Sequence, residues 1–110
     1  MGLEISASAI RAVNTRQAVT ANNVANLDTP AFQAQRAELV EQPGGGVRVG
    51  QISPDETPGA PGPDGNPRSN VNLAGEATSQ ITDTNLLRAN ANAFRAQAQL
   101  QDALLRLAPD

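Results

Sequence analysis

The first third of the chain carries apolar side chains at the spacing of a helix. Five of them share one stripe when the chain is wound as a helix: Leu3, Ile10, Val13, Val24 and Leu27. Gln17 and Thr20 interrupt this stripe, which predicts an amphipathic helix from about Leu3 to Leu27 with a narrow and partly polar seam. Since the residue before a proline disfavours helical geometry, Pro30 predicts that the helix ends near Leu27.

A second helical pattern fills the last third of the chain. Steps of four and three from Leu73 give positions that are mostly apolar: Leu73, Ala77, Gln80, Thr84, Leu87, Ala91, Phe94, Ala98, Gln101, Leu105 and Ala108. This heptad-like seam predicts a helix from about Asn72 to Leu107, roughly 50 Å long at 1.5 Å per residue. Asn72 is the expected N-cap, and Glu76 lies near the helix start, where the helix dipole favours an acid.

The middle of the chain has a different composition. Thirteen of the 25 residues from 43 to 67 are Gly or Pro, a content that resists helices and sheet interiors. One segment, GVRVGQI, alternates apolar and polar residues and fits one short strand, with a slip before Ile52. We find no partner strand in the sequence, so this segment should either pair with a neighbour or stay a loop.

These patterns predict an all-α fold. Two long helices form an antiparallel coiled-coil-like hairpin, and a Pro/Gly-rich loop with at most one or two short β-strands joins them. The expected divisions are residues 3–42 for the first helix and its turn, 43–68 for the linker and 69–108 for the second helix. Alanine is the commonest residue, with 19 copies, and buries little surface. A pair of such helices cannot offset the entropy of ordering about 60 residues, so the chain should need other chains.

Composition and charge exclude several function classes. The net charge is −3 and the eight cationic residues are scattered arginines, so we expect no nucleic-acid partner. There is no cysteine and no histidine, and the acids Asp55, Glu56 and Asp64 lie in the flexible middle. We therefore expect no enzymatic activity, no cofactor and no metal site. Neither an apolar run of about 18 residues nor a cleavable signal pattern occurs, so direct membrane insertion is not expected.

Three asparagines, Asn22, Asn23 and Asn26, fall at the end of the first predicted helix. They have two interpretations. Asparagine satisfies stray backbone groups where a helix ends. Alternatively, a carboxamide offers two donors and an acceptor without charge, so buried asparagines can fix the register between packed chains.

The segment around these asparagines resembles the N-terminal signature of bacterial flagellar axial proteins, the rod and hook family. The matching residues are Ala21, Asn22, Asn23, Val24, Ala25, Asn26, Asp28, Thr29, Pro30 and Phe32. The opening of the family's C-terminal helix is similar to a second set: Asn70, Val71, Asn72, Leu73 and Glu76. The linker is similar to the short one of the proximal-rod, FlgC-type subgroup. One departure is Ala31, where the family usually has a glycine and a left-handed backbone would strain an alanine.

The resemblance implies a structural subunit of the bacterial flagellar basal-body rod. Such a subunit polymerises through its terminal helices into the tubular drive shaft that carries motor torque to the hook. Its partners would be copies of itself, other rod and axial proteins, and the flagellar export apparatus, through which it would pass without a cleaved signal peptide. It would be located in the basal body, in the rod that spans the periplasm. The alternative is a soluble coiled-coil adaptor or scaffold of another assembly, which explains the seam but not the signature.

The resemblance also assigns roles to residues. Subunit packing is expected from six apolar side chains, for which packing within one chain is the alternative: Val13, Val24, Leu27, Leu87, Phe94 and Leu105. Asn22, Asn23 and Asn26 would set the register between packed helices. The turn that leaves the first helix would be anchored by three residues: Thr29, Pro30 and Phe32.

Overall fold

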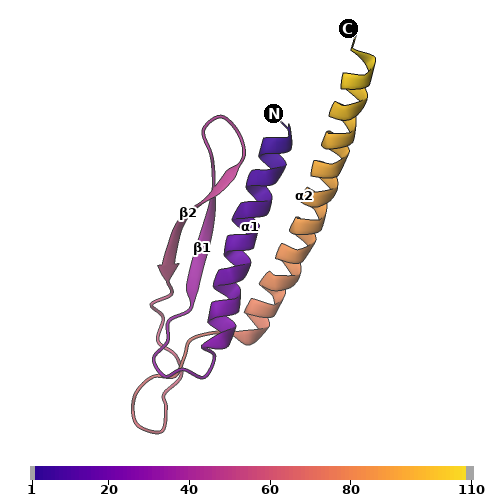
Figure 1. The fold of residues 1–110 in the computed structure, drawn as a ribbon. Coiled ribbons are helices and arrows are strands. Elements are labelled where there is room, and N and C mark those ends of the chain that lie inside the picture. Colours follow the sequence, from indigo (N-terminus) through magenta and orange to yellow (C-terminus); the bar gives the residue numbers. More distant parts are fainter. Residues whose placement is uncertain (1, 109–110) are drawn as a thin grey trace.

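The computed structural model describes residues 2–108, which form two helices and one β-hairpin (Figure 1). The elements follow in the order α1 (Gly2–Ala25), β1 (Gln35–Glu41), β2 (Val47–Pro54) and α2 (Leu73–Leu107). The molecule measures 75 × 25 × 14 Å and has a radius of gyration of 19.2 Å. A compact domain of this length would have a radius of about 13 Å. The elongated shape leaves little room for a core.

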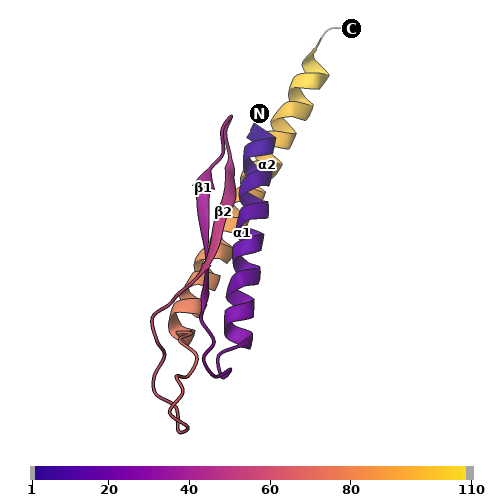
Figure 2. The same ribbon diagram turned by 90° about the vertical axis from the view of Figure 1, so that its left-hand side faces the viewer.

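Helix α1 occupies the centre of the structure. It contacts α2 and both strands, and the two views show the hairpin lying along α1 (Figures 1 and 2). The helices run antiparallel, and α2 projects past the start of α1 (Figure 1). Because α2 and both strands contact α1, the position of each of them depends on α1.

Neither α1 nor α2 is long and apolar enough to cross a membrane.

The prediction of an all-α fold is wrong, because the chain between the helices folds into an antiparallel sheet. Strands β1 and β2 pair from Gln35 with Pro54 to Glu41 with Val47. The prediction of a strand in GVRVGQI is confirmed by β2, but the expectation that it has no partner in the chain is wrong. The partner β1 was missed because its sequence, QRAELVE, is mostly polar. Its alternation of exposed Arg36 and Glu38 with half-buried Ala37 and Leu39 is the signal that marks it as a strand.

A β-bulge explains the slip in the β2 pattern. Glu38 pairs with Gln51 and Leu39 pairs with Val49, which leaves Gly50 as the extra residue. A Cβ atom on Gly50 would lie 2.9 Å from the methyl groups of Val40, closer than real Cβ contacts occur. Glycine at this position lets the two strands stay paired across the bulge.

The helix boundaries follow the local sequence signals. Helix α1 ends at Ala25, two residues before the predicted Leu27, and a turn follows it. The prediction that Asn72 is the N-cap of α2 is confirmed, since its side chain accepts a hydrogen bond of 3.1 Å from the backbone N–H of Gly75. Capping and proline placement therefore set these ends, as local chemistry predicts.

The interior holds little apolar surface. Among residues 2–108 the buried apolar side chains are Ala12, Val13 and Ala34. More than half of the surface of six large apolar residues is exposed: Leu73, Ile81, Leu100, Leu104, Leu105 and Leu107. All six belong to α2. In the single chain, most of the apolar surface of α2 therefore remains in contact with water.

The turn after α1 contains a strained residue that allows a test of the fold. Ala31 has a φ of +62°, and its N–H donates a hydrogen bond of 2.9 Å to the carbonyl of Pro67. Left-handed backbone is unfavourable for alanine but not for glycine. We therefore predict that Ala31→Gly raises the free energy of unfolding by about 0.5–1 kcal/mol, measured by circular dichroism at one fixed protein concentration.

The control is the same chemical change where the backbone is helical. Ala18→Gly, on the exposed side of α1, should lower the free energy of unfolding by about 1 kcal/mol. If both substitutions destabilise the chain equally, Ala31 does not have the left-handed conformation.

Candidate functional site

The two helices meet along a seam of polar residues spaced seven apart. Asn23 Nδ2 donates to Glu76 Oε1 at 2.6 Å, and Arg16 Nε donates to Asp83 Oδ1 at 3.0 Å. A step of seven back along α1 (23 to 16) thus matches a step of seven forward along α2 (76 to 83). This spacing is that of an antiparallel heptad pairing.

The same register continues to the start of α1. A Cβ atom on Gly2 would lie 2.6 Å from Nε2 of Gln97, so Gly2 lies directly beside the end of the Gln97 side chain. Ser6 Oγ also donates to Gln97 Oε1 at 3.0 Å. We call the α2 positions of this register the polar seam: Glu76, Asp83, Asn90 and Gln97.

The polar seam fixes the register of α1 against α2 but contributes little to the free energy of folding. Asp83 is 1% exposed, whereas the side chain of its partner Arg16 keeps 28% of its surface in contact with solvent. The loss of hydration of a buried ion pair roughly cancels its attraction, but an uncompensated buried charge is strongly destabilising. Any shift of the helices along each other would leave at least one of Asp83 and Glu76 without its partner on α1. The helices can therefore pair in one register only.

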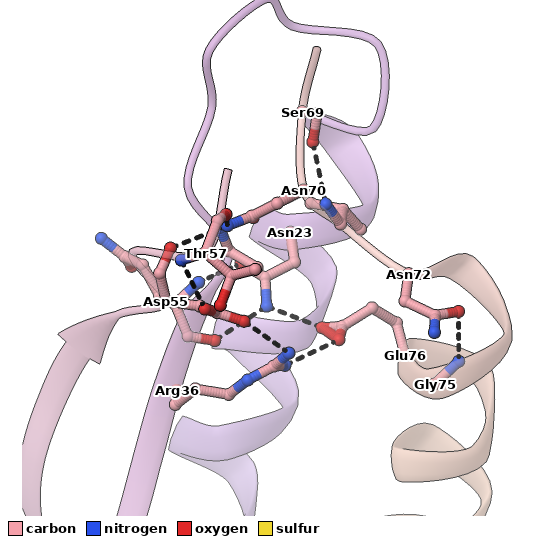
Figure 3. A network of polar contacts seen from close by, with 12 residues as sticks. Asn23, Arg36, Asp55, Thr57, Ser69, Asn70, Asn72, Gly75 and Glu76 are labelled. Carbon is pink, nitrogen blue, oxygen red and sulfur yellow. Dashed lines mark hydrogen bonds and ion pairs between the residues drawn. The ribbon is translucent and has the colours of Figure 1, made fainter. Parts of the chain in front are cut away.

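At one end of the seam, Asn23 joins three elements (Figure 3). Its carboxamide exchanges two hydrogen bonds with the backbone of Gln35 in β1, of 2.9 Å to the carbonyl and 2.8 Å from the N–H. The same nitrogen reaches Glu76 of α2, whose other oxygen accepts a hydrogen bond of 3.0 Å from Arg36. Asn23 is 1% exposed, so it connects α1 to the sheet and to α2 inside one chain.

Asn70 makes a similar junction where the chain approaches α2. Its Oδ1 accepts a hydrogen bond of 2.6 Å from the N–H of Ala34, and its Nδ2 donates to the carbonyls of Asp55 and Thr57 at 2.7 Å (Figure 3). Its backbone N–H donates to the carbonyl of Phe32 at 3.1 Å. One carboxamide thus ties together the segments before β1, after β2 and before α2.

Two aspartates in the loops have lowered pKa values. Hydrogen bonds from Thr57, the backbone N–H first, lower the pKa of Asp55 below its ordinary value of 3.8. Hydrogen bonds from Asn66, again with the backbone N–H first, lower the pKa of Asp64 in the same direction. Because the folded pKa is the lower one, both loops are favoured above about pH 4 and lose this contribution as the pH falls.

The other motif asparagines lie on the surface. Asn22 is exposed, and Asn26 donates a hydrogen bond of 2.9 Å to the carbonyl of Asn22. Thr29 Oγ1 donates to Asn26 Oδ1 at 3.0 Å, and Pro30 is exposed. Within this chain, Asn26 satisfies a backbone group at the end of α1. A register-setting role of these residues between chains stays a prediction.

The six predicted packing residues have different surroundings. Val13 is buried at 2% exposure, and Leu27 and Leu87 are half-buried. Val24, Phe94 and Leu105 are exposed, by 38%, 39% and 69%.

The predicted α2 stripe meets α1 only in part, at Thr84, whose Oγ1 accepts a hydrogen bond of 3.2 Å from Nε2 of Gln17. The stripe that begins at Leu73 contains no buried residue in the described part of the chain, and the polar seam lies about a quarter turn around the helix. Arg16, Asp83 and Gln97 were missed as seam residues, although the seven-residue spacing of polar side chains in α2 marks them.

The comparison with known families gives a match at the start of the chain. Residues 3–33 match the family described as "Flagella basal body rod protein". The match supports the flagellar basal-body rod family. It covers nearly all of α1 and the turn that follows, including Asn23 at the junction of the three elements. A comparison with curated proteins found no match. The family is a structural component of the flagellum.

The Asn23 junction yields a prediction with a neighbouring control. Asn23→Ala leaves the Gln35 backbone groups and Glu76 without a partner, so we predict a loss of about 2–3 kcal/mol in the free energy of unfolding. Asn22→Ala, one residue away and exposed, should change it by no more than about 0.5 kcal/mol. Urea unfolding followed by circular dichroism, at one protein concentration high enough for the chain to be helical, measures both, and equal effects would contradict the buried role of Asn23.

Proposed function

We propose that this chain is a structural subunit of the flagellar basal-body rod, of the proximal-rod type. It polymerises through its terminal helices into the tubular shaft that transmits motor torque to the hook. One observation carries the proposal beyond the family match: α2 contacts α1 through polar residues and keeps most of its large apolar side chains exposed. A helix with that distribution gains burial only from other chains.

The exposed stripe of α2 is the proposed packing surface between subunits. Leu73, Ile81 and Leu105 are each more than half exposed, and Leu87 and Phe94 lie along the same side of the helix. Full burial of a large aliphatic side chain contributes roughly 1.5–3 kcal/mol, more than the polar seam gives. The partners are further copies and other axial proteins. Torque would then be shared among many such contacts.

The chain between the helices supports the proximal-rod assignment. In the described residues it holds one β-hairpin and a Pro/Gly-rich loop, without the large β-rich insertion that marks hook and distal-rod members of the resembled family. A subunit with so few buried apolar side chains unfolds at a low cost in free energy, which suits passage through a narrow export channel. Export through the flagellar apparatus without a cleaved signal, to the rod that spans the periplasm, is part of the proposal.

Deletion and complementation test this function. A bacterium that lacks the gene should lose motility, and electron microscopy should show basal bodies with incomplete rods. The wild-type gene should restore both, whereas Ile81→Gln with Leu105→Gln should not, because these exposed side chains supply contacts between subunits. The matched control, Asn85→Gln with Asn92→Gln, changes exposed polar positions of α2 and should restore both. Complete rods in the deletion strain would contradict the proposal and favour the adaptor.

A further inference from the structure

Helix α2 carries two arginines on the face that points away from α1. Arg88 and Arg95 each follow a polar-seam position by five residues, which is about 140° around the helix. Both are exposed, and neither makes an ion pair within residues 2–108. The other charged residues of α2 are all in ion pairs: Glu76, Asp83, Asp102 and Arg106. The outer face of α2 therefore keeps positive charge that the chain itself does not neutralise.

Strand β1 has an open edge on the side away from β2. The carboxamide of Asn23 bonds both backbone groups of Gln35, so these groups point outward from the hairpin. Outward and inward groups alternate along an antiparallel strand, so the backbone groups of Leu39 and Glu41 point outward as well. Within residues 2–108 no hydrogen bond from another segment reaches those two residues. An open strand edge of this kind is a surface that another element can cover.

The same edge carries free negative charge. Arg36 of β1 pairs with Asp55 and Glu76, whereas Glu38 and Glu41 are exposed and have no ion pair in the described part of the chain. Charged side chains on an edge strand oppose pairing with a second strand of the same charge. The edge of β1 therefore favours a cationic cover. The hairpin and α2 lie on opposite sides of α1, so α2 of the same chain does not provide it (Figures 1 and 2).

The two pairs of charges have matching spacing. Arg88 and Arg95 are seven residues apart, or about 10.5 Å along the helix. Glu38 and Glu41 are three residues apart, or about 10 Å along the strand. Strand β1 and helix α2 also run in the same direction (Figure 1). A second α2 laid along the edge of β1 in that direction can bring one arginine to each carboxylate.

A single displacement along the molecule aligns both pairs. Asn23 bonds Gln35 of β1 and Glu76 of α2, so these two residues lie at about the same level. From this level, the two free glutamates of β1 lie about 10 and 20 Å along the molecule. The two free arginines of α2 lie about 18 and 28 Å along it. A shift of one copy by about 8 Å therefore brings both arginines level with both glutamates.

The helix surface around the two arginines allows a close approach. Ala89, Ala91 and Ala96 are exposed there, and each extends only one carbon atom from the backbone. Leu87 and Phe94, which belong to the proposed packing stripe, directly precede the two arginines. Apolar surface that needs burial thus lies beside the charges.

We propose that the outer face of α2 in one copy covers the open edge of β1 in a second copy, with Arg88 against Glu38 and Arg95 against Glu41. This inference rests on the proposed function and names a lateral contact within it. The contact joins two different sides of the molecule, so it repeats from copy to copy and does not close into a dimer. Exposed ion pairs contribute little affinity each, so they select the orientation while the neighbouring apolar stripe supplies the burial.

Charge reversal of each surface in the full chain tests this contact. One variant carries Arg88→Glu with Arg95→Glu, and the other carries Glu38→Arg with Glu41→Arg. Each change replaces attraction by repulsion, so self-association in low salt should weaken by about tenfold or more, measured by sedimentation velocity. Salt of about 1 M should remove most of this difference, because it screens charges beyond about 3 Å.

A third variant with all four reversals in one chain is the decisive one. It keeps the net charge of −3 and again places arginines opposite glutamates, so its association should return to within about threefold of the wild type. All four positions are exposed, so the fold tolerates the changes. An equimolar mixture of the first two variants should recover association as well, because every contact then joins glutamates to arginines.

The matched control is Arg11→Glu with Arg68→Glu. It makes the same change in net charge as the α2 reversal, at two exposed arginines outside the proposed contact, and should weaken association by less than about threefold. The contact is overturned if this control weakens association as much as the α2 reversal, or if either reversal leaves it unchanged. It is also overturned if the four reversals together restore nothing.

The failure of this contact can be told from the failure of the proposed function. No recovery by the four reversals, with rods still restored by the wild-type gene, would overturn the contact alone. Recovery by the four reversals, with complete rods in the deletion strain, would overturn the proposed function alone.

Discussion

The seam between α1 and α2 is held by hydrogen bonds and a buried ion pair, and the rest of the structure depends on this. Asp83 and Glu76 are almost completely buried, and Arg16 and Asn23 reach them from the other helix. Such contacts allow one register because any other leaves a charge without a partner. They contribute little net stability, since the loss of hydration offsets most of the attraction. The pair of helices is therefore well defined in geometry but weakly stabilised.

Because the seam is polar, the apolar side chains of α2 lie on other faces. Leu73 and Ile81 are exposed along the helix, and Leu104 is exposed at its projecting end. An intramolecular apolar seam would have used these residues within one chain and left a self-sufficient hairpin. Here α2 keeps them exposed, so only contacts with other chains can bury them, as the proposed assembly would. This division agrees with the proposed passage through a narrow export channel before assembly.

Much of the fold could be predicted from local chemistry. Helical periodicity located both helices, Asn72 marked the start of α2, and the proline at position 30 placed the end of α1 to within two residues. The strain at Ala31, by contrast, was expected from the resemblance, because the family usually has a glycine at this position. These signals act within a few residues of the chain, so they are visible in the sequence.

The errors arose where distant segments decide the outcome. Strand β1 is polar and forms because β2 and α1 lie beside it, which no local propensity reveals. The apolar stripe of α2 was expected to pack against other subunits, with packing inside the chain as the alternative, and apolar periodicity alone does not distinguish the two. The polar face that meets α1 was not identified, because only the pairing of Arg16 and Asn23 with Asp83 and Glu76 across the seam shows it. Similarly, the junction at Asn70 joins three loops that are far apart in sequence.

The most direct test of the central claim is the concentration dependence of helix content in the purified full chain. Circular dichroism and sedimentation should be recorded together from micromolar to near-millimolar protein. If the exposed apolar faces need sister molecules, the chain should have low helix content as a monomer and should gain helix as its mass increases. A compact monomer that melts cooperatively, with a midpoint independent of concentration, would contradict the claim.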